Sequence, residues 1–312
     1  MHALYPKRTT PQIAAWILLG LLAGCAGGTS IVAMPEPTAP ALTDPVSLGE
    51  RGPYGVLRVP QRVRVRVDAT LDVTVLVPLV ATGTAARARP VAVLVHGGLV
   101  SPDRYEWLGV HLATRGFVVL VPSHALDLAF FEQENALAAL RVLRDRSREP
   151  GDALEGTMDD APAAILGHSL GGVVASSLWD EHPDDLDELV LFASFPASST
   201  LRTRSAGRAL SIHGGADARV TLAQTQSGVR AIATSGRPAT LAVVDGMNHM
   251  QIADRVTASE AEAAGTATID EASARARLCW LVDAMLWPRV GGAADALDDD
   301  AEWPSGTHRE AP

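Results

Sequence analysis

Short runs of mostly apolar residues recur from residue 91 onward, and they constrain the fold more than any other feature. The runs cover residues 91–95, 117–121, 163–166, 189–192, 209–212 and 240–244. Strands without polar alternation are buried on both faces, which is typical of parallel strands covered by helices. Helical patterns alternate with these runs or follow them, at residues 102–115, 130–147, 170–180 and 271–287. The sequence therefore predicts an α/β fold with a doubly wound, mostly parallel sheet.

The segments on either side of these runs set the expected boundaries of the domain. Residues 63–67 and 71–77 alternate like strands and predict an antiparallel pair at its N-terminal side, whereas the last apolar run is expected to be the last strand. The connection over residues 193–208 is too short to hold a large lid domain. We expect one large α/β domain over residues 51–289 and an acidic, disordered tail over residues 290–312.

The N-terminal segment has the features of a secretion signal. Lys7 and Arg8 precede an apolar run over residues 13–22, and this arrangement is typical of a secretory signal peptide. The run is shorter than a membrane-spanning helix requires. It leads directly into Leu22-Ala23-Gly24-Cys25, which resembles the bacterial lipobox.

The lipobox resemblance implies cleavage before Cys25 and a diacylglycerol on its thiol. We expect residues 1–24 to be a lipoprotein signal peptide, and residues 25–50 to comprise the lipidated cysteine and a flexible Ala/Pro/Thr-rich tether. Stable anchoring requires more than one acyl chain. The implied location is the bacterial cell envelope, where the protein is anchored to a membrane and faces the periplasm or the exterior.

Composition excludes several kinds of chemistry and partner. Lys7 is the only lysine of the chain, so a mature domain without it has no Ser–Lys dyad, Schiff base or lysine-bound pyridoxal phosphate. The formal net charge is −10 and no Lys/Arg-rich run is present, which argues against nucleic acid as a partner. Cys279 is the only cysteine besides Cys25, and its apolar helical setting predicts a buried structural thiol. We expect neither a cofactor nor a metal.

A candidate nucleophile stands at the junction of a predicted strand and a predicted helix. Gly167-His168-Ser169-Leu170-Gly171 fits the pattern G-x-S-x-G, and it follows a strand and opens a helix as that pattern requires. Both flanking positions are glycine because the tight turn leaves no room for side chains. The turn exposes the hydroxyl of Ser169, and the backbone amide of Leu170 is placed to bind a developing oxyanion.

A serine hydroxyl needs a base, and the base needs an orienting acid. His249 follows the last predicted strand, and Asp217 follows the strand before it. The sequence intervals from Ser169 to Asp217 and from Asp217 to His249 each correspond to roughly one βα unit. We expect His249 to take the proton from Ser169, and Asp217 to hold the imidazole in the correct tautomer.

Other candidates for the acid and the base fit less well. Asp245 is too close to His249 in the sequence to approach it from another strand, and it is interpreted as a turn residue. His168 is fixed on the turn, His182 lies in a charged loop, and His213 stands at a strand end. Each of these three histidines is expected to be structural.

These motifs resemble the α/β-hydrolase superfamily, in particular the branch of dienelactone-hydrolase-like proteins, chlorophyllases and platelet-activating-factor acetylhydrolases. The resemblance rests on HGGLVSPDRYEWLGVHLATRGFVVLVP at residues 96–122, GHSLGG at 167–172 and GMNHMQI at 246–252. It implies the triad order serine, acid, histidine and a second oxyanion donor in the amide of Gly98. Dienelactone hydrolases carry a cysteine nucleophile, whereas this chain has Ser169, which favours ester hydrolysis.

The sequence therefore predicts a serine hydrolase that cleaves small-molecule carboxylic esters through an acyl-enzyme intermediate outside the cytoplasm. Two alternatives stay open: a catalytically silent envelope-binding lipoprotein on the same fold, and a serine peptidase or acyltransferase. An acyl pocket and ordinary core packing are equally compatible with one set of apolar residues: Leu99, Phe130, Phe131, Phe195 and Met250.

Overall fold

The computed structural model describes residues 51–80, 82–129, 133–204, 206–290, 297 and 303–310. The predicted signal peptide, the lipidation site and the tether lie outside these residues. All described residues belong to one compact unit. Within it, no helix is both long and apolar enough to cross a membrane.

The unit is built on one sheet with the strand order β1-β2-β4-β3-β5-β6-β7-β8-β9. The strands from β4 to β8 run parallel, whereas β1 and β2 form an antiparallel pair that joins the sheet through β4. This arrangement confirms the predicted mostly parallel sheet with its antiparallel N-terminal pair. The strands are β1 Gly55–Arg66, β2 Ala69–Leu79, β3 Val91–Val95, β4 Val118–Ser123, β5 Ala163–His168, β6 Leu186–Phe192, β7 Arg208–Gly214, β8 Ala239–Val244 and β9 Thr307–Glu310.

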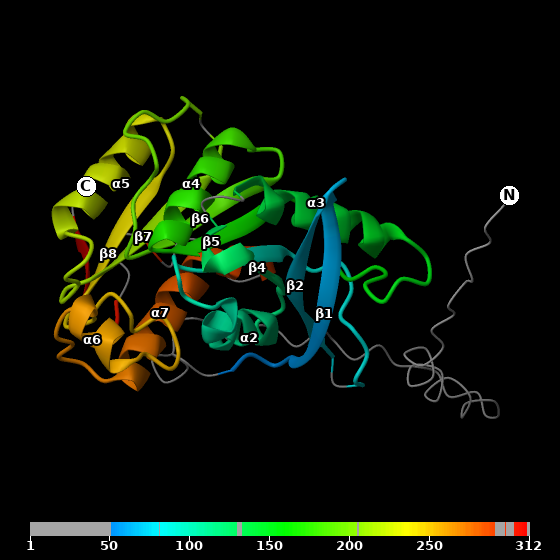
Figure 1. The fold of residues 1–312 in the computed structure, drawn as a ribbon, viewed down its shortest axis with the longest axis horizontal. Helices are drawn as coiled ribbons and strands as arrows, with labels where there is room; N and C mark the ends of the chain where they lie inside the picture. The colour runs from blue at the N-terminus through cyan, green and yellow to red at the C-terminus, as the bar shows by residue number, and fades with distance from the viewer. Residues whose placement is uncertain are drawn as a thin grey trace, which may run out of the picture. The chain divides into compact units, whose positions relative to one another are not determined.

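Helices cover both faces of the sheet (Figure 1). The buried apolar side chains form two hydrophobic cores, one on each face of the sheet. In β3, Val91, Val93 and Val95 belong to the core that includes α3, α4 and α5, whereas Ala92 and Leu94 belong to the core that includes α2 and α7. This alternation explains why the central strands carry apolar residues at every position. The α-helices are α2 Glu106–Thr114, α3 Gln133–Arg148, α4 Leu170–Glu181, α5 Leu222–Thr234, α6 Ala258–Ala264 and α7 Glu271–Leu286, and the short 3-10 helices are η2 Pro102–Tyr105, η3 Ala125–Asp127 and η5 Trp287–Val290.

The C-terminal segment differs from the prediction of a disordered tail. Residues 307–310 form β9, which pairs antiparallel with the outer edge of β8, so β8 is not the last strand. The ring of Trp303 packs against Trp280 of α7, with 5.8 Å between ring centroids. The prediction of disorder was therefore wrong for residues 303–310. A polar four-residue strand has no apolar pattern of its own, and it forms because an edge strand and an aromatic neighbour are available.

Candidate active site

The candidate nucleophile lies on a strained turn between β5 and α4. Ser169 has φ 51° and ψ −122°, a conformation that non-glycine residues adopt only where the surroundings enforce it. A Cβ atom at Gly167 would lie 2.5 Å from the backbone oxygen of Gly171, and one at Gly171 would lie 2.2 Å from the backbone oxygen of His96. The flanking glycines are therefore sterically required.

The structure brings the three predicted triad residues together. The Oγ atom of Ser169 lies 3.0 Å from Nε2 of His249, and Nδ1 of His249 lies 2.9 Å from Oδ2 of Asp217. A carboxylate can only accept, so Nδ1 of His249 carries the proton, and Nε2 is left to accept from the serine hydroxyl. The side chain of Asp217 is fully buried and that of His249 is 3% exposed, whereas Ser169 is only half-buried.

The local backbone keeps Asp217 ionised. Burial alone would raise the pKa of this carboxyl. The hydrogen bonds from His249 and from the amides of Val220 and Arg219 lower the pKa by more than burial raises it, so the net shift is downward. The two amides donate to Oδ1 over 2.9 and 2.7 Å. Oδ2 therefore remains directed at His249, and the negative charge can stabilise the imidazolium that forms during proton transfer.

The predicted oxyanion donors lie side by side. Leu170 opens α4, so its amide belongs to the first turn, where N–H groups have no acceptor within the helix. A Cβ atom at Gly98 would lie only 3.0 Å from the side chain of Leu170, which places the loop after β3 directly against the start of α4. The amide of Leu99 is held by the backbone oxygen of Asp127. Because the amide of Gly97 is also taken, by the hydroxyl of Tyr105, Gly98 is the residue of this turn whose amide is left beside the start of α4.

Two buried residues near the triad were not assigned a role from the sequence. His168 precedes Ser169 and was expected to be only structural, and Tyr105 lies in η2. The Nδ1 atom of His168 lies 2.8 Å from the hydroxyl of Tyr105, and its Nε2 atom lies 2.9 Å from the backbone oxygen of His249. The only sequence signal was the position of His168 inside the G-x-S-x-G motif, and Tyr105 had none.

The remaining polar candidates have structural partners. The Nδ1 atom of buried His213 lies 3.2 Å from the hydroxyl of Thr225. Asp245 is 60% exposed and lies 3.5 Å from His308, consistent with a turn residue outside the triad.

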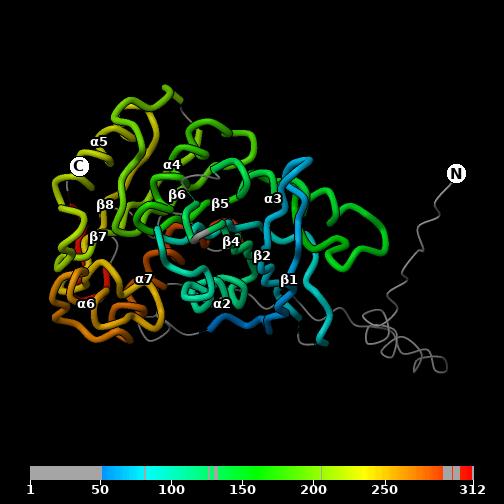
Figure 2. Tube along the Cα trace, in the orientation of Figure 1, coloured from blue at the N-terminus to red at the C-terminus, as the bar shows by residue number. Residues whose placement is uncertain are grey.

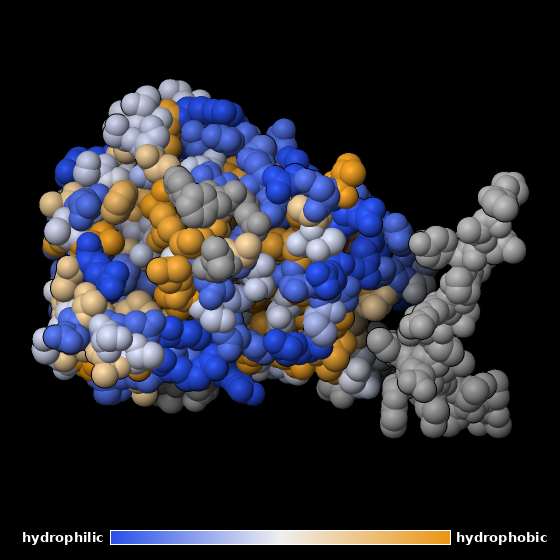
Figure 3. Space-filling view, in the orientation of Figure 1, coloured by the Kyte–Doolittle hydropathy of each residue, from blue (hydrophilic) through white to orange (hydrophobic). Residues whose placement is uncertain are grey.

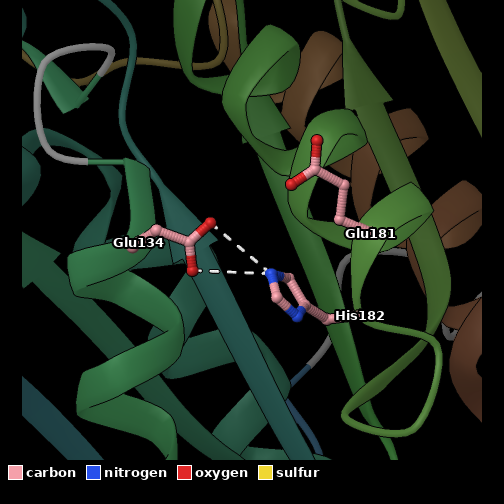
Figure 4. Close-up of side chains that lie close together, drawn as sticks. All are labelled: Glu134, Glu181 and His182. Atoms are coloured by element: carbon pink, nitrogen blue, oxygen red, sulfur yellow. Dashed lines mark hydrogen bonds and ion pairs between the residues drawn. The ribbon is translucent and has the colours of Figure 1, made fainter.

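One group of ligand-type side chains lies apart from the triad residues. Among the described residues, Glu134, Glu181 and His182 bring ligand atoms within 4.8 Å of one another. Figure 4 shows Glu134 at the start of α3 facing His182 at the end of α4. The Nε2 atom of His182 is 3.4 Å from a carboxylate oxygen that belongs to a 61% exposed side chain. An exposed contact between a histidine and a carboxylate needs no metal, and we assign none to it.

The apolar residues proposed for an acyl pocket separate in the structure. Met250 is 4% exposed and belongs to the core cluster, which identifies it as a packing residue. Leu99 is 72% exposed, Phe195 is half-buried, and Phe130 and Phe131 lie outside the described residues. Figure 3 shows hydrophobic surface near the middle of the face viewed, bordered by hydrophilic surface.

The fold and the site geometry agree with the comparisons with known proteins. The chain belongs to the α/β-hydrolase family, whose model matches residues 91–256. Among solved structures, a ferulic acid esterase from Streptomyces cinnamoneus is similar, with 19% sequence identity and a TM-score of 0.64. The match covers 84% of this chain and 97% of that chain, and at this identity it shows a shared fold. No curated protein sequence matches the chain.

Proposed function

We propose that this protein is a serine esterase that cleaves carboxylic esters by way of an acyl-enzyme intermediate. The observation that carries the proposal is the continuous hydrogen-bond line from Ser169 Oγ through His249 to Asp217, with distances of 3.0 and 2.9 Å. A nucleophile, a base and an orienting acid in this order are what acyl transfer requires.

In the acylation step, Ser169 Oγ forms a bond with the ester carbonyl carbon while its proton moves to Nε2 of His249. The carbonyl oxygen becomes an oxyanion, which the amides of Gly98 and Leu170 bind. When the intermediate collapses, the bond to the alcohol oxygen breaks, and His249 returns the proton to the leaving alkoxide. The acyl group then remains on Ser169.

In the deacylation step, water takes the place of the alcohol. The oxygen of the water attacks the acyl carbon while His249 removes a proton from the water. When the bond from the acyl carbon to Ser169 Oγ breaks, His249 returns this proton to Oγ and the acid leaves. Asp217 stays ionised throughout, because its role is to stabilise the transient imidazolium. Each preorganised oxyanion donor contributes about 3 kcal/mol to the barrier reduction in sites of this kind.

Small or extended esters are the substrates that we propose. Among the described residues, the connection from β6 to β7 holds no helical lid over the site. The similar fold of a ferulic acid esterase makes feruloyl esters a useful probe beside p-nitrophenyl esters of increasing chain length.

A fluorophosphonate probe tests the nucleophile directly. We expect the wild-type protein to be labelled and Ser169→Ala to remain unlabelled, with Ser198→Ala as a matched control that keeps its labelling. Ser198 is an exposed serine in the connection after β6. Folded wild-type protein that resists the probe and cleaves no ester would overturn the proposal and favour a catalytically silent binding protein.

We also propose that the enzyme acts outside the cytoplasm, with residues 1–24 as a signal peptide and residues 25–50 as a lipidated tether. Leu22-Ala23-Gly24-Cys25 supports this location. Cys25→Ser should move the protein from the membrane fraction to the soluble fraction, and Cys279→Ser, which alters the buried cysteine of α7, should leave it membrane-bound. Membrane retention of Cys25→Ser would refute the anchor.

A further inference from the structure

A short 3-10 helix, η2, lies between the loop after β3 and helix α2. Its last residue, Tyr105, has no exposed surface and its hydroxyl reaches back to the turn that precedes Gly98. The amide of Gly97 donates to this hydroxyl over 3.1 Å. A Cβ atom at Gly97 would lie 2.9 Å from the hydroxyl and 2.7 Å from Nδ1 of His168. The backbone of the oxyanion loop therefore rests directly on these two side chains.

The directions of the hydrogen bonds through this pair follow from the partners. The backbone oxygen of His249 can only accept, so Nε2 of His168 donates to it over 2.9 Å. Because that nitrogen carries the proton of the neutral ring, Nδ1 accepts from the hydroxyl of Tyr105 over 2.8 Å. The hydroxyl in turn accepts from the amide of Gly97. One line of hydrogen bonds thus runs from the oxyanion loop to the backbone of the catalytic base.

The burial of His168 keeps this line in one state. Desolvation is the largest cause and the neighbouring His249 the second, and together they lower the pKa of His168 to about 3. The ring therefore stays neutral over the pH range in which an esterase of this type works, and its tautomer is fixed by the carbonyl of His249. The two imidazole rings lie 4.8 Å apart between centroids. His168 is also joined covalently to Ser169, so it contacts all three parts of the site.

The outer side of η2 is fixed as well. Arg104, the residue before Tyr105, forms a bidentate pair with Glu260 of α6 over 2.7 and 3.1 Å. It also donates to the backbone oxygen of Asp254, in the segment that follows His249. In Figures 1 and 2, α6 lies on the same side of the sheet as α2 and α7. Short helix η2 is therefore held between the oxyanion loop and the segment after β8.

We propose that Tyr105 and His168 are positioning residues, which act as one hydrogen-bonded unit to fix the Gly97–Gly98 amides relative to Ser169 and His249. This inference rests on the proposed esterase function and adds residues to it that neither touch the substrate nor carry its proton. The unit acts on the transition state, because oxyanion donors must be in place before charge develops. Displacements of about 1 Å in such sites cost about 100-fold in rate.

The test is Tyr105→Phe, which removes one oxygen and keeps the ring in the core. We expect kcat for a p-nitrophenyl ester to fall about 10- to 100-fold with KM within about twofold of wild type. Affinity for a trifluoromethyl ketone, which binds as an oxyanion on Ser169, should fall by the same factor as kcat/KM. Tyr54→Phe is the matched control and should change neither quantity, because Tyr54 lies directly before β1 and its ring contacts Arg89, outside this unit.

A second variant keeps the test decisive if Tyr105→Phe destabilises the fold, and it tests His168 separately from Tyr105. His168→Gln retains an amide donor for the carbonyl of His249 and lacks the ring acceptor for Tyr105. Because the two side chains act as one unit, the double variant should be less impaired than the product of the two single losses. Full multiplication of the losses in folded protein would overturn the proposal, as would Tyr105→Phe with wild-type kcat and ketone affinity. If the wild-type protein turns over esters, the proposed function stands even when one of these two results overturns the role of Tyr105 and His168.

Discussion

Asp217→Asn gives the sharpest test of the triad, because the structure determines how the new amide must lie. The two backbone amides of Arg219 and Val220 donate to Oδ1 over 2.7 and 2.9 Å, and they require an acceptor there. The oxygen of the asparagine amide therefore takes this place, and its NH₂ group faces His249. Nδ1 of His249 must then accept, which puts the ring proton on Nε2, opposite the hydroxyl of Ser169.

An imidazole in that tautomer cannot remove the proton of Ser169. The side chain keeps its volume and its bonds to the two amides, so we expect the fold to be preserved. The expected loss in kcat is about 10⁴-fold, equivalent to about 5.5 kcal/mol of transition-state stabilisation. KM should change little, because the carboxylate contacts no substrate.

The assay is steady-state hydrolysis of a p-nitrophenyl ester, with thermal unfolding measured beside it. Asp245→Asn is the matched control, since it makes the same chemical change at a 60% exposed carboxylate after β8 and should retain wild-type activity. If folded Asp217→Asn kept kcat within tenfold of wild type, the tautomer argument would be refuted. Equal losses in the two variants would point to a general effect of charge.

Three further predictions concern stability and the turn. Burial lowers the pKa of His111, but the Asp283 carboxylate outweighs this effect and raises the pKa to about 10. The protonated imidazole therefore stabilises the fold fully below about pH 6.5, and this contribution is lost as the pH rises toward 10. The free energy of unfolding in urea should fall over this pH range, and Asp283→Asn should reduce that pH dependence and cost about 3 kcal/mol of stability. Trp303→Ala should lower stability by about 2 kcal/mol through lost packing on α7, measured by the same method; an unchanged midpoint would contradict the role of β9. Gly171→Ala, whose Cβ would meet the oxygen of His96 at 2.2 Å, should abolish fluorophosphonate labelling or soluble expression.

Strands that are buried on both faces could be predicted from the sequence, and strands held only by their neighbours could not. β3 begins and ends at the predicted residues because Val91–Val95 is apolar throughout. The predicted strand 63–67 is longer in the structure, because the alternating residues before it extend β1 back to Gly55. β9 was missed because Thr307–Glu310 has no apolar periodicity, and its pairing with β8 is a tertiary interaction.

The site could be predicted where the chain order carries the information. Ser169, Asp217 and His249 each follow a strand of the same parallel set, so the carboxyl ends of β5, β7 and β8 bring them to one edge of the sheet. The contact between Tyr105 and His168 spans 63 residues and depends on the path of η2. No periodicity or motif indicates such a contact, so it emerges only from the three-dimensional arrangement.

The unit of Tyr105 and His168 also clarifies why a strained nucleophile is tolerated. A left-handed conformation at a serine costs on the order of 1 to 3 kcal/mol, and the turn of Ser169 must be held by its surroundings. Its amide donates to the oxygen of Phe192 over 3.0 Å, and its own oxygen accepts from the hydroxyl of Ser194 over 2.7 Å. His168 adds the third restraint, from the preceding residue to the backbone of the base. The hydrogen bonds that offset the strain also set the distance from Ser169 to His249. A change that relaxed the turn would therefore also displace the nucleophile from its base.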